Sequence, residues 1–176
     1  PSDASGTSLF DCAHRRWSQE IAGAFDVDPA TLPPCSESTI PTASLTADAA
    51  AELGLVAGTP IVGGAGDQAA SAIGSGIVCE GAVSATIGTS GVVFAASDRW
   101  RSTERGEAHA FCHAVPERWH LMGVMLSCGG SLRWFRDAFG YPAGDAGYEA
   151  IMRDAASSEP GARGAIFLPY LTGERT

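Results

Sequence analysis

The sequence predicts an α/β fold, because short apolar segments of β character alternate with stretches of helical character along its 176 residues. One observation is a strand, turn and helix pattern: residues 61–63 form a short apolar run, further glycines follow, and residues 67–75 are small and suit a closely packed helix. Another is the region 83–126, whose β-branched and aromatic runs are typical of a sheet. We therefore expect a mixed structure built around a glycine-rich turn.

The composition narrows the class of partner. Hydrophobic residues make up 45% of the chain, which is enough for a core. No stretch approaches the roughly 20 apolar residues of a membrane span, and the first residues lack the features of a signal peptide. A cytoplasmic protein is therefore expected. A net charge of −9 works against binding to nucleic acid and favours a small-molecule partner.

All 11 basic residues are arginines, so the chain holds no lysine. This excludes the phosphate-binding lysine of a Walker A motif and the lysine of a Schiff base. If the chain handles phosphate, it must therefore use backbone amides, hydroxyl groups, arginine or a metal ion.

Three short elements are expected near the beginning of the chain. Residues 7–11 have the character of a short strand, and apolar residues at helical spacing predict a helix at 17–25. Asp28 can cap a helical turn that begins at Pro29, before further prolines stop it.

The next two elements frame the glycine-rich turn. The alanine-rich stretch 46–53 predicts a helix with Thr46 as N-cap and Gly54 as C-cap. After it, residues 61–63 predict a buried strand, and residues 67–75 predict a helix.

The second half of the sequence predicts a small sheet and two helices. The expected elements are strands at 83–88, 92–95, 109–115, 119–126 and 165–168, and helices at 131–139 and 148–156. The turns between the first four strands suggest a meander of antiparallel strands. Gly129 and Gly130 come directly before the first of these helices, whose N-terminal dipole favours anions.

The cysteines and histidines show no metal-binding pattern. No two of the five cysteines have Cys-x-x-Cys spacing, and their odd number argues against a complete disulfide framework. The adjacent Cys112 and His113 would point to opposite faces of a strand. We therefore expect reduced, structural thiols and no structural metal.

Residues 64–69 (GAGDQA) match the G-x-G-x-x-A pattern of dinucleotide-binding turns. In a nicotinamide-dependent oxidoreductase, an acidic residue at the end of the next strand would hold the ribose. The next strand ends in residues 86–88 (TIG), which have no carboxylate. An oxidoreductase that uses this turn therefore remains an alternative, but one with a key feature missing.

Asp67 has two interpretations. An aspartate that follows glycine at a helix start is often an N-cap. The same carboxylate can instead accept the proton of an attacking hydroxyl group. A second glycine turn at 88–91 (GTSG) and the pair Gly129 and Gly130 offer backbone amides and hydroxyl groups to phosphate. Together the three turns favour phosphoryl transfer to an alcohol.

Four blocks of the sequence together resemble the FGGY family of carbohydrate kinases. They follow the family's order and are residues 3–11 (DASGTSLFD), 63–70 (GGAGDQAA), 87–92 (IGTSGV) and 167–176 (FLPYLTGERT). The last block is the most specific, and the members that phosphorylate xylulose are the most similar. The resemblance implies a ribonuclease H-like, actin-like ATPase fold, with ATP and sugar bound between two domains.

By this resemblance, Asp67 is the general base that accepts the proton of a sugar hydroxyl as it attacks the γ-phosphate of ATP. Gln68 is then a neighbouring contact to the sugar. The implied reaction converts D-xylulose to D-xylulose 5-phosphate. Ribulose, gluconate or glycerol as substrate, the oxidoreductase and a non-catalytic protein are the alternatives.

The resemblance also assigns the nucleotide contacts. Gly88, Thr89 and Ser90 correspond to a phosphate-binding turn, and Gly129 and Arg133 to positions that touch ATP. Mg²⁺ supplies positive charge that a lysine would otherwise give. None of the chain's residues is assigned as a ligand of that ion.

The resemblance places residues 1–76 in the C-terminal part of the first, sugar-binding domain. Residues 77–176 then form the N-terminal part of the second, ATP-binding domain. The family's amino-terminal phosphate loop and adenosine-binding segment are not among the four blocks, so this chain alone is expected to be inactive or nearly so. Incomplete sheets leave edges that can pair with another copy, which makes a homodimer a further expectation.

Overall fold

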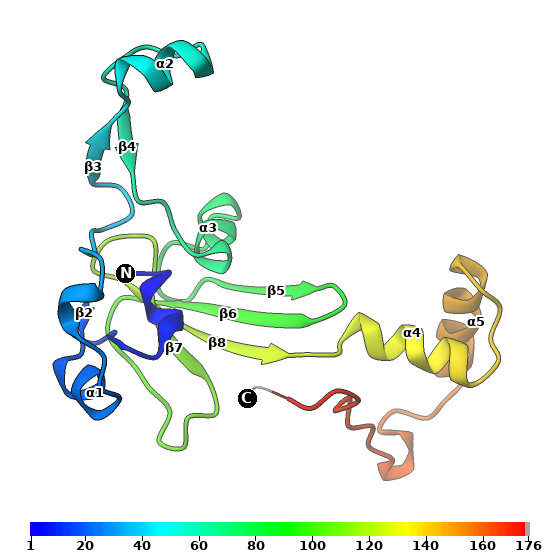
Figure 1. The fold of residues 1–176 in the computed structure, drawn as a ribbon. Helices are drawn as coiled ribbons and strands as arrows, with labels where there is room; N and C mark the ends of the chain where they lie inside the picture. Colours follow the sequence, from blue (N-terminus) through cyan, green and yellow to red (C-terminus); the bar gives the residue numbers. More distant parts are fainter. Residues whose placement is uncertain (175–176) are drawn as a thin grey trace. The chain divides into compact units, whose positions relative to one another are not determined.

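The computed structural model describes residues 1–174 and consists of short helices and strands (Figure 1). It divides into two compact units, one made of residues 1–84 and 94–122 and the other of residues 85–93 and 123 onward. No helix among the described residues is long and apolar enough to cross a bilayer. The last two residues of the 167–176 block lie outside the described residues, and the domain division at residue 76 stays a prediction.

The first unit holds most of the short elements. In chain order they are η1 (Ala4–Thr7), β1 (Phe10–Asp11), β2 (Arg16–Trp17), α1 (Gln19–Ala24), η2 (Pro29–Thr31), β3 (Pro41–Ser44), α2 (Ala47–Leu53), β4 (Pro60–Val62), α3 (Asp67–Gly74) and β7 (His109–Cys112). Strand β1 pairs antiparallel with β2, and β3 pairs antiparallel with β4.

The main sheet contains β7 together with β5 (Val83–Ile87), β6 (Gly91–Ser97) and β8 (Trp119–Met125), in the order β5-β6-β8-β7. The four expected strands are confirmed, but the expected meander is wrong, because β6 lies next to β8 and not next to β7. A meander needs tight turns between consecutive strands. Residues 98–108 instead form a long connection that carries the chain past the position of β8.

The predicted helix caps are confirmed. The Thr46 hydroxyl accepts a hydrogen bond from the Ala49 amide at 3.3 Å, and Gly54 ends α2 in the left-handed region at φ 67°. The Asp28 carboxylate caps η2 by accepting from the Ala30 amide at 2.9 Å. Each of these predictions rests on residues close together in the chain, which is why the sequence alone can support them.

Three predicted strands differ from the structure. The strand expected at 7–11 covers only Phe10–Asp11, because η1 extends to Thr7 and Ser8 takes a left-handed φ of 63°. Strand β4, which the sequence predicts to be buried, is exposed, with Ile61 42% accessible, since it pairs only with β3 in a sheet of two strands. Residues 165–168 form no strand, because no neighbouring strand pairs with them among the described residues.

Two small clusters form the core of the first unit. One contains Phe10, Cys12 and Cys112, and both of these cysteines are free thiols. The other contains Phe94 with Ala72 of α3 and Ala96 of β6. The second cluster matters for the site, because it fixes the buried face of α3 against the sheet residues of its own unit.

The second unit is built on two helices, α4 (Gly129–Ala138) and α5 (Asp145–Ala156), followed by η3 (Ala162–Gly164). The Arg136 guanidinium lies over the Tyr148 ring at 4.9 Å, and the Tyr141 hydroxyl donates a hydrogen bond to Asp154 at 2.6 Å. These contacts hold α5 against the end of α4.

Candidate functional site

Asp67 is the first residue of α3, and Gly66 rather than Asp67 occupies the N-cap position. Its Oδ1 atom accepts a hydrogen bond from the adjacent Gln68 amide at 2.7 Å. The N-cap interpretation is therefore wrong, because a capping carboxylate would bind an amide further into the helix. The side chain is exposed, and within residues 1–174 its Oδ2 atom has no hydrogen-bond partner.

The chain reaches Asp67 through a turn that only glycine allows without strain. Gly64 has a φ of 70°, in the left-handed region that other residues rarely adopt. After the turn, Ala69 and Ala72 are each 3% exposed and bury one face of α3. Asp67 therefore stands at the start of a packed helix, with the half-buried Gln68 beside it.

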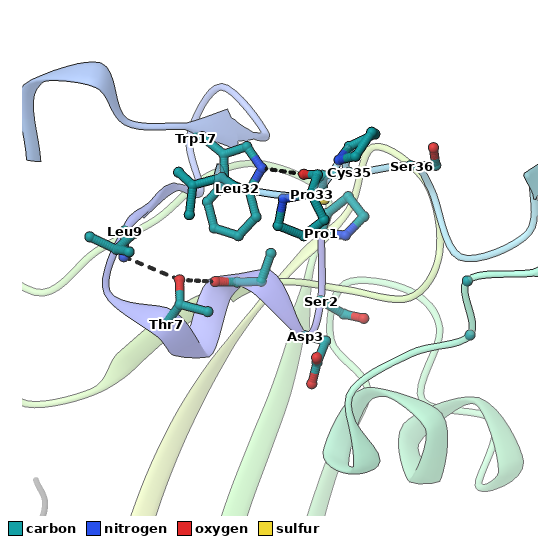
Figure 2. Close-up of a pocket in the computed structure, with 14 residues that line it drawn as sticks. Pro1, Ser2, Asp3, Thr7, Leu9, Trp17, Leu32, Pro33, Cys35 and Ser36 are labelled. Carbon is teal, nitrogen blue, oxygen red and sulfur yellow. Dashed lines mark hydrogen bonds between the residues drawn. The ribbon is translucent and has the colours of Figure 1, made fainter. Parts of the chain in front are cut away.

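A cavity of about 520 Å³ lies beside this turn. Gly63 and Gly64 line it together with Ser2 and Asp3, whereas Asp67 is not among its lining residues. Figure 2 shows an apolar group formed by Trp17, Leu32 and Pro33, with Ser2 and Asp3 standing apart from it. The turn before Asp67 thus borders a space of small-molecule size.

In the second unit, the structure joins the two other glycine turns into one site. The Gly129 amide donates to the Gly88 carbonyl at 2.9 Å, and the amides of Gly130 and Cys128 both donate to the Thr89 carbonyl, at 3.1 Å and 2.8 Å. A Cβ atom at Gly129 would lie 2.5 Å from the Gly88 carbonyl oxygen. This separation is too short for any other residue, so the glycine is required for the close approach.

A second cavity, of about 370 Å³, opens at this junction. It brings together four residues to which the family resemblance assigns nucleotide contacts, namely Gly88, Thr89, Gly129 and Arg133. Ser90 belongs to the same turn, where its carbonyl accepts from the Gly88 amide at 2.8 Å, but it does not line the cavity. Asp67 and Gln68 belong to the other unit.

Sequence reasoning missed other residues that line this cavity, including Leu132 and Tyr148. A signal existed for Leu132, because it follows Gly129 by one helical turn and so shares its face. Tyr148 gave no such signal, since it comes from α5 and meets the turn only in the folded chain.

The expectation that the N-terminus of α4 binds an anion is wrong for its first amides. Those of Gly129 and Gly130 are used by carbonyl groups of the 88–89 turn, and the Ser131 and Leu132 amides donate to the Cys128 carbonyl. Within the described residues, the side-chain donors without a partner that line this cavity are the hydroxyl groups of Thr89 and Tyr148 and the guanidinium of Arg133. The Ser90 hydroxyl, in the same turn, also has no partner within residues 1–174. Neutral and cationic donors of this kind suit phosphate oxygens.

The described residues do not form a complete metal site by themselves. Across residues 1–174, no group of three or more histidine, cysteine, aspartate or glutamate side chains is placed to hold a metal ion. Mg²⁺ therefore stays an expectation from the family resemblance, and no step is assigned to it.

The dinucleotide-binding interpretation loses its structural basis. In such a fold, the strand before the glycine turn belongs to a parallel sheet with a crossover helix. Here the strand before the turn is β4, which pairs antiparallel with β3 in a sheet of two strands.

Comparison with known proteins agrees with the motifs. Residues 1–74 match the FGGY family of carbohydrate kinases, N-terminal domain. The chain is 39% identical over 175 residues to the xylulose kinase of Escherichia coli (strain K12), a match that covers 99% of this chain and 35% of that protein.

Solved structures give the same result. A xyloylose kinase from Brucella ovis matches with a TM-score of 0.85 at 39% identity, and a gluconate kinase from Lactobacillus acidophilus with a TM-score of 0.86 at 25% identity. Each match covers 99% of this chain and 35% of that chain, so this chain spans about a third of the length of these relatives. The chain belongs to the FGGY family of carbohydrate kinases, and its α/β elements are those of the family's actin-like ATPase fold.

Proposed function

We propose that the protein transfers the γ-phosphate of ATP to a hydroxyl group of D-xylulose and so forms D-xylulose 5-phosphate. The observation that carries this proposal is the cavity where the 88–90 turn meets α4, because its free hydroxyl groups and the Arg133 guanidinium suit a polyphosphate. The 39% identity to a xylulose kinase supports the choice of sugar. The activity is proposed for the protein made from its complete reading frame, since this chain spans 35% of that relative.

In this proposal Asp67 is the general base and Gln68 contacts the sugar. The sugar oxygen forms a bond to the γ-phosphorus, the bond from that phosphorus to the leaving ADP oxygen breaks, and the hydroxyl proton passes to the Asp67 carboxylate. An exposed carboxylate whose Oδ2 atom is unoccupied within residues 1–174 supports this role. A base of this kind contributes about 10²–10⁴-fold in rate.

In the same proposal Thr89, Ser90 and Arg133 offer donors to the phosphates of ATP, and Gly88 and Gly129 shape the close turn on which these donors stand. Arg133 supplies a fixed positive charge, which a chain without lysine can obtain only from arginine or a metal ion. Mg²⁺ would accompany the nucleotide and neutralise charge as the phosphoryl group moves. We also propose the domain division at residue 76 and a cytoplasmic location.

The test is a coupled assay of ADP release by the protein made from its complete reading frame, with D-xylulose, D-ribulose, gluconate and glycerol as separate substrates. We expect kcat/KM for D-xylulose to exceed that of each competitor by about tenfold or more, and ³¹P NMR to detect a new sugar monophosphate. Faster turnover of gluconate would replace the proposed sugar but keep the kinase. Absence of ADP release with every substrate, or reduction of NAD⁺ instead, would overturn the proposal.

A further inference from the structure

We propose that Ser2 is a positioning residue for Asp67, because its hydroxyl group holds the backbone amide of Gly66, the residue directly before the proposed general base. The inference rests on the proposed function, since it concerns the aim of the Asp67 carboxylate. It assigns a role to a side chain 64 positions from the turn that it contacts, at Gly66.

The contact is specific and shielded from water. Ser2 is 7% exposed, and its Oγ atom accepts a hydrogen bond from the Gly66 amide at 3.2 Å. Gly66 is the N-cap residue of α3, so the bond acts on the peptide group between Ala65 and Gly66, one residue before Asp67. Without this acceptor, the amide would lose its partner in a partly buried position.

The backbone around Ser2 supports the same turn by packing. A Cβ atom at Gly66 would lie 3.5 Å from the Ser2 carbonyl oxygen and 3.6 Å from the Asp3 Cα atom. These are ordinary van der Waals separations, so the backbone of residues 2–3 lies directly against the turn. The hydrogen bond and the packing therefore restrain the same residue, Gly66.

Ser2 is itself anchored to the main sheet through Ser5. The Ser5 hydroxyl donates to the Pro1 carbonyl at 2.7 Å and accepts from the Cys112 amide at 3.1 Å. Cys112 is fully buried in β7, and Ser5 is buried in η1. A connected set of contacts thus runs from a buried strand, through the first residues, to the turn before Asp67.

The turn needs this hydrogen bond because its own residues offer few side-chain contacts. Residues 63–66 have the sequence GGAG, so only one methyl group is available for packing. Glycine also has the widest backbone freedom of any residue. Since a misplacement of about 1 Å can cost about 10²-fold in rate, a single restraining bond at Gly66 has a direct kinetic consequence.

The experiment measures kcat and KM for D-xylulose in the protein made from its complete reading frame. We expect Ser2→Ala to lower kcat by about 5- to 30-fold while KM for ATP changes by less than about twofold, because only the aim of the base changes. Ser2→Thr keeps the acceptor oxygen and should restore kcat to within about threefold of the wild type.

Thr46→Ala is the matched control. It removes the same type of bond, from a hydroxyl group that accepts from an amide at 3.3 Å, but at the N-terminus of α2. We expect it to leave kcat unchanged. A fall in kcat in this control as large as that in Ser2→Ala would overturn the assignment of a specific role.

The donor side gives a direct readout of the same bond. The Gly66 amide is the donor, so its hydrogen is protected from exchange while the Ser2 hydroxyl accepts it. Hydrogen exchange of the Gly66 amide, which should speed up in Ser2→Ala, reports the bond without any assay of activity.

The outcomes separate this inference from the proposed function. If Asp67→Asn is inactive but Ser2→Ala keeps wild-type kcat, only the positioning role fails, even if the melting temperature falls. If Asp67→Asn is fully active, the proposed base fails instead. Should Ser2→Ala not fold, Ser2→Cys keeps a similar volume with a weaker acceptor, and an unchanged kcat there would overturn the inference.

Discussion

Two glycine-rich turns of this chain look alike in sequence but use glycine for different physical reasons. In the turn before Asp67, Gly64 is needed for its backbone conformation, because its φ is 70° while a Cβ atom there would meet no other atom within 4 Å. At the junction of the 88–90 turn and α4, Gly129 has no positive φ and is needed for its size, because a Cβ atom would lie 2.5 Å from the Gly88 carbonyl oxygen.

The two turns are also held differently. The turn before Asp67 is restrained by a side-chain bond from Ser2, whereas the 88–90 turn is tied to α4 by backbone bonds from Cys128, Gly129 and Gly130. Several backbone bonds suit the 88–90 turn, which must present donors at fixed positions. A single side-chain bond is enough to orient the turn that carries the Asp67 carboxylate. Similar glycine-rich segments therefore provide a left-handed backbone conformation in one unit and a close backbone contact in the other.

The sharpest test of this difference is Gly129→Ala. Because the added methyl group meets the Gly88 carbonyl, we expect the turn to shift and kcat/KM for ATP to fall by about 10²-fold. Gly123→Ala is the control, since Gly123 lies in the same unit and a Cβ atom there would have no neighbour within 4 Å. Equal effects of the two substitutions on kcat/KM would show that close approach is not why position 129 is glycine.

Acid should loosen the support of the Asp67 turn. Burial, together with the smaller effect of the charge of nearby His113, lowers the pKa of His120 to about 3. His120 stacks on Phe94 at 4.1 Å, and Phe94 packs against Ala72 of α3. The unfolded chain binds this proton near pH 6.5, whereas the folded chain binds it only near pH 3. The contribution of His120 to the free energy of unfolding is therefore fully present above pH 6.5, and it is lost by about 1 kcal/mol per pH unit as the pH falls towards 3.

Urea unfolding of wild type and His120→Phe across this pH range checks the prediction. Neither ring nitrogen of His120 has a hydrogen-bond partner among the described residues, so phenylalanine can replace the ring without leaving a donor unpaired. We expect the variant to lose less stability in acid. Identical pH profiles for the two proteins would show that His120 does not titrate on unfolding.

A substitution at Arg133 tests whether its guanidinium donates to the phosphates of ATP beside the 88–90 turn. Replacing its guanidinium in Arg133→Met should raise KM for ATP by about tenfold, because one charge-assisted contact to phosphate is lost. Arg153→Met removes a cation from α5 outside the cavity and should leave KM unchanged. If KM for ATP is the same in Arg133→Met as in wild type, Arg133 does not contact the nucleotide.

The smallest expected effect concerns the conformational role of Gly64. Alanine at a φ of 70° is strained, so Gly64→Ala should lower the free energy of unfolding by about 1 kcal/mol. The adjacent Gly63→Ala has open space and no positive φ, which makes it the matched control in denaturant unfolding. Equal stability of the two variants would mean that Gly64 relaxes to an ordinary conformation.

The sequence predicted features whose causes are local. Residues close in the chain determine the caps of α2 and the start of α3. They also determine that the glycine turns before Asp67 and at 88–90 each follow a strand. The order of the main sheet, the exposure of Ile61 and the contact between Ser2 and Gly66 depend on long-range packing, which no local pattern encodes. Tyr148 was missed for the same reason, since its place at the cavity depends on how α5 folds back.

The central claim is that Asp67 is the general base, and kinetics of Asp67→Asn in the protein made from its complete reading frame test it most directly. Asp48→Asn is the matched control, because Asp48 is also an exposed aspartate in the first turn of a helix. We expect Asp67→Asn to lower kcat by about 10²–10⁴-fold with KM for ATP nearly unchanged, and Asp48→Asn to have no effect. Wild-type turnover in Asp67→Asn would contradict the account.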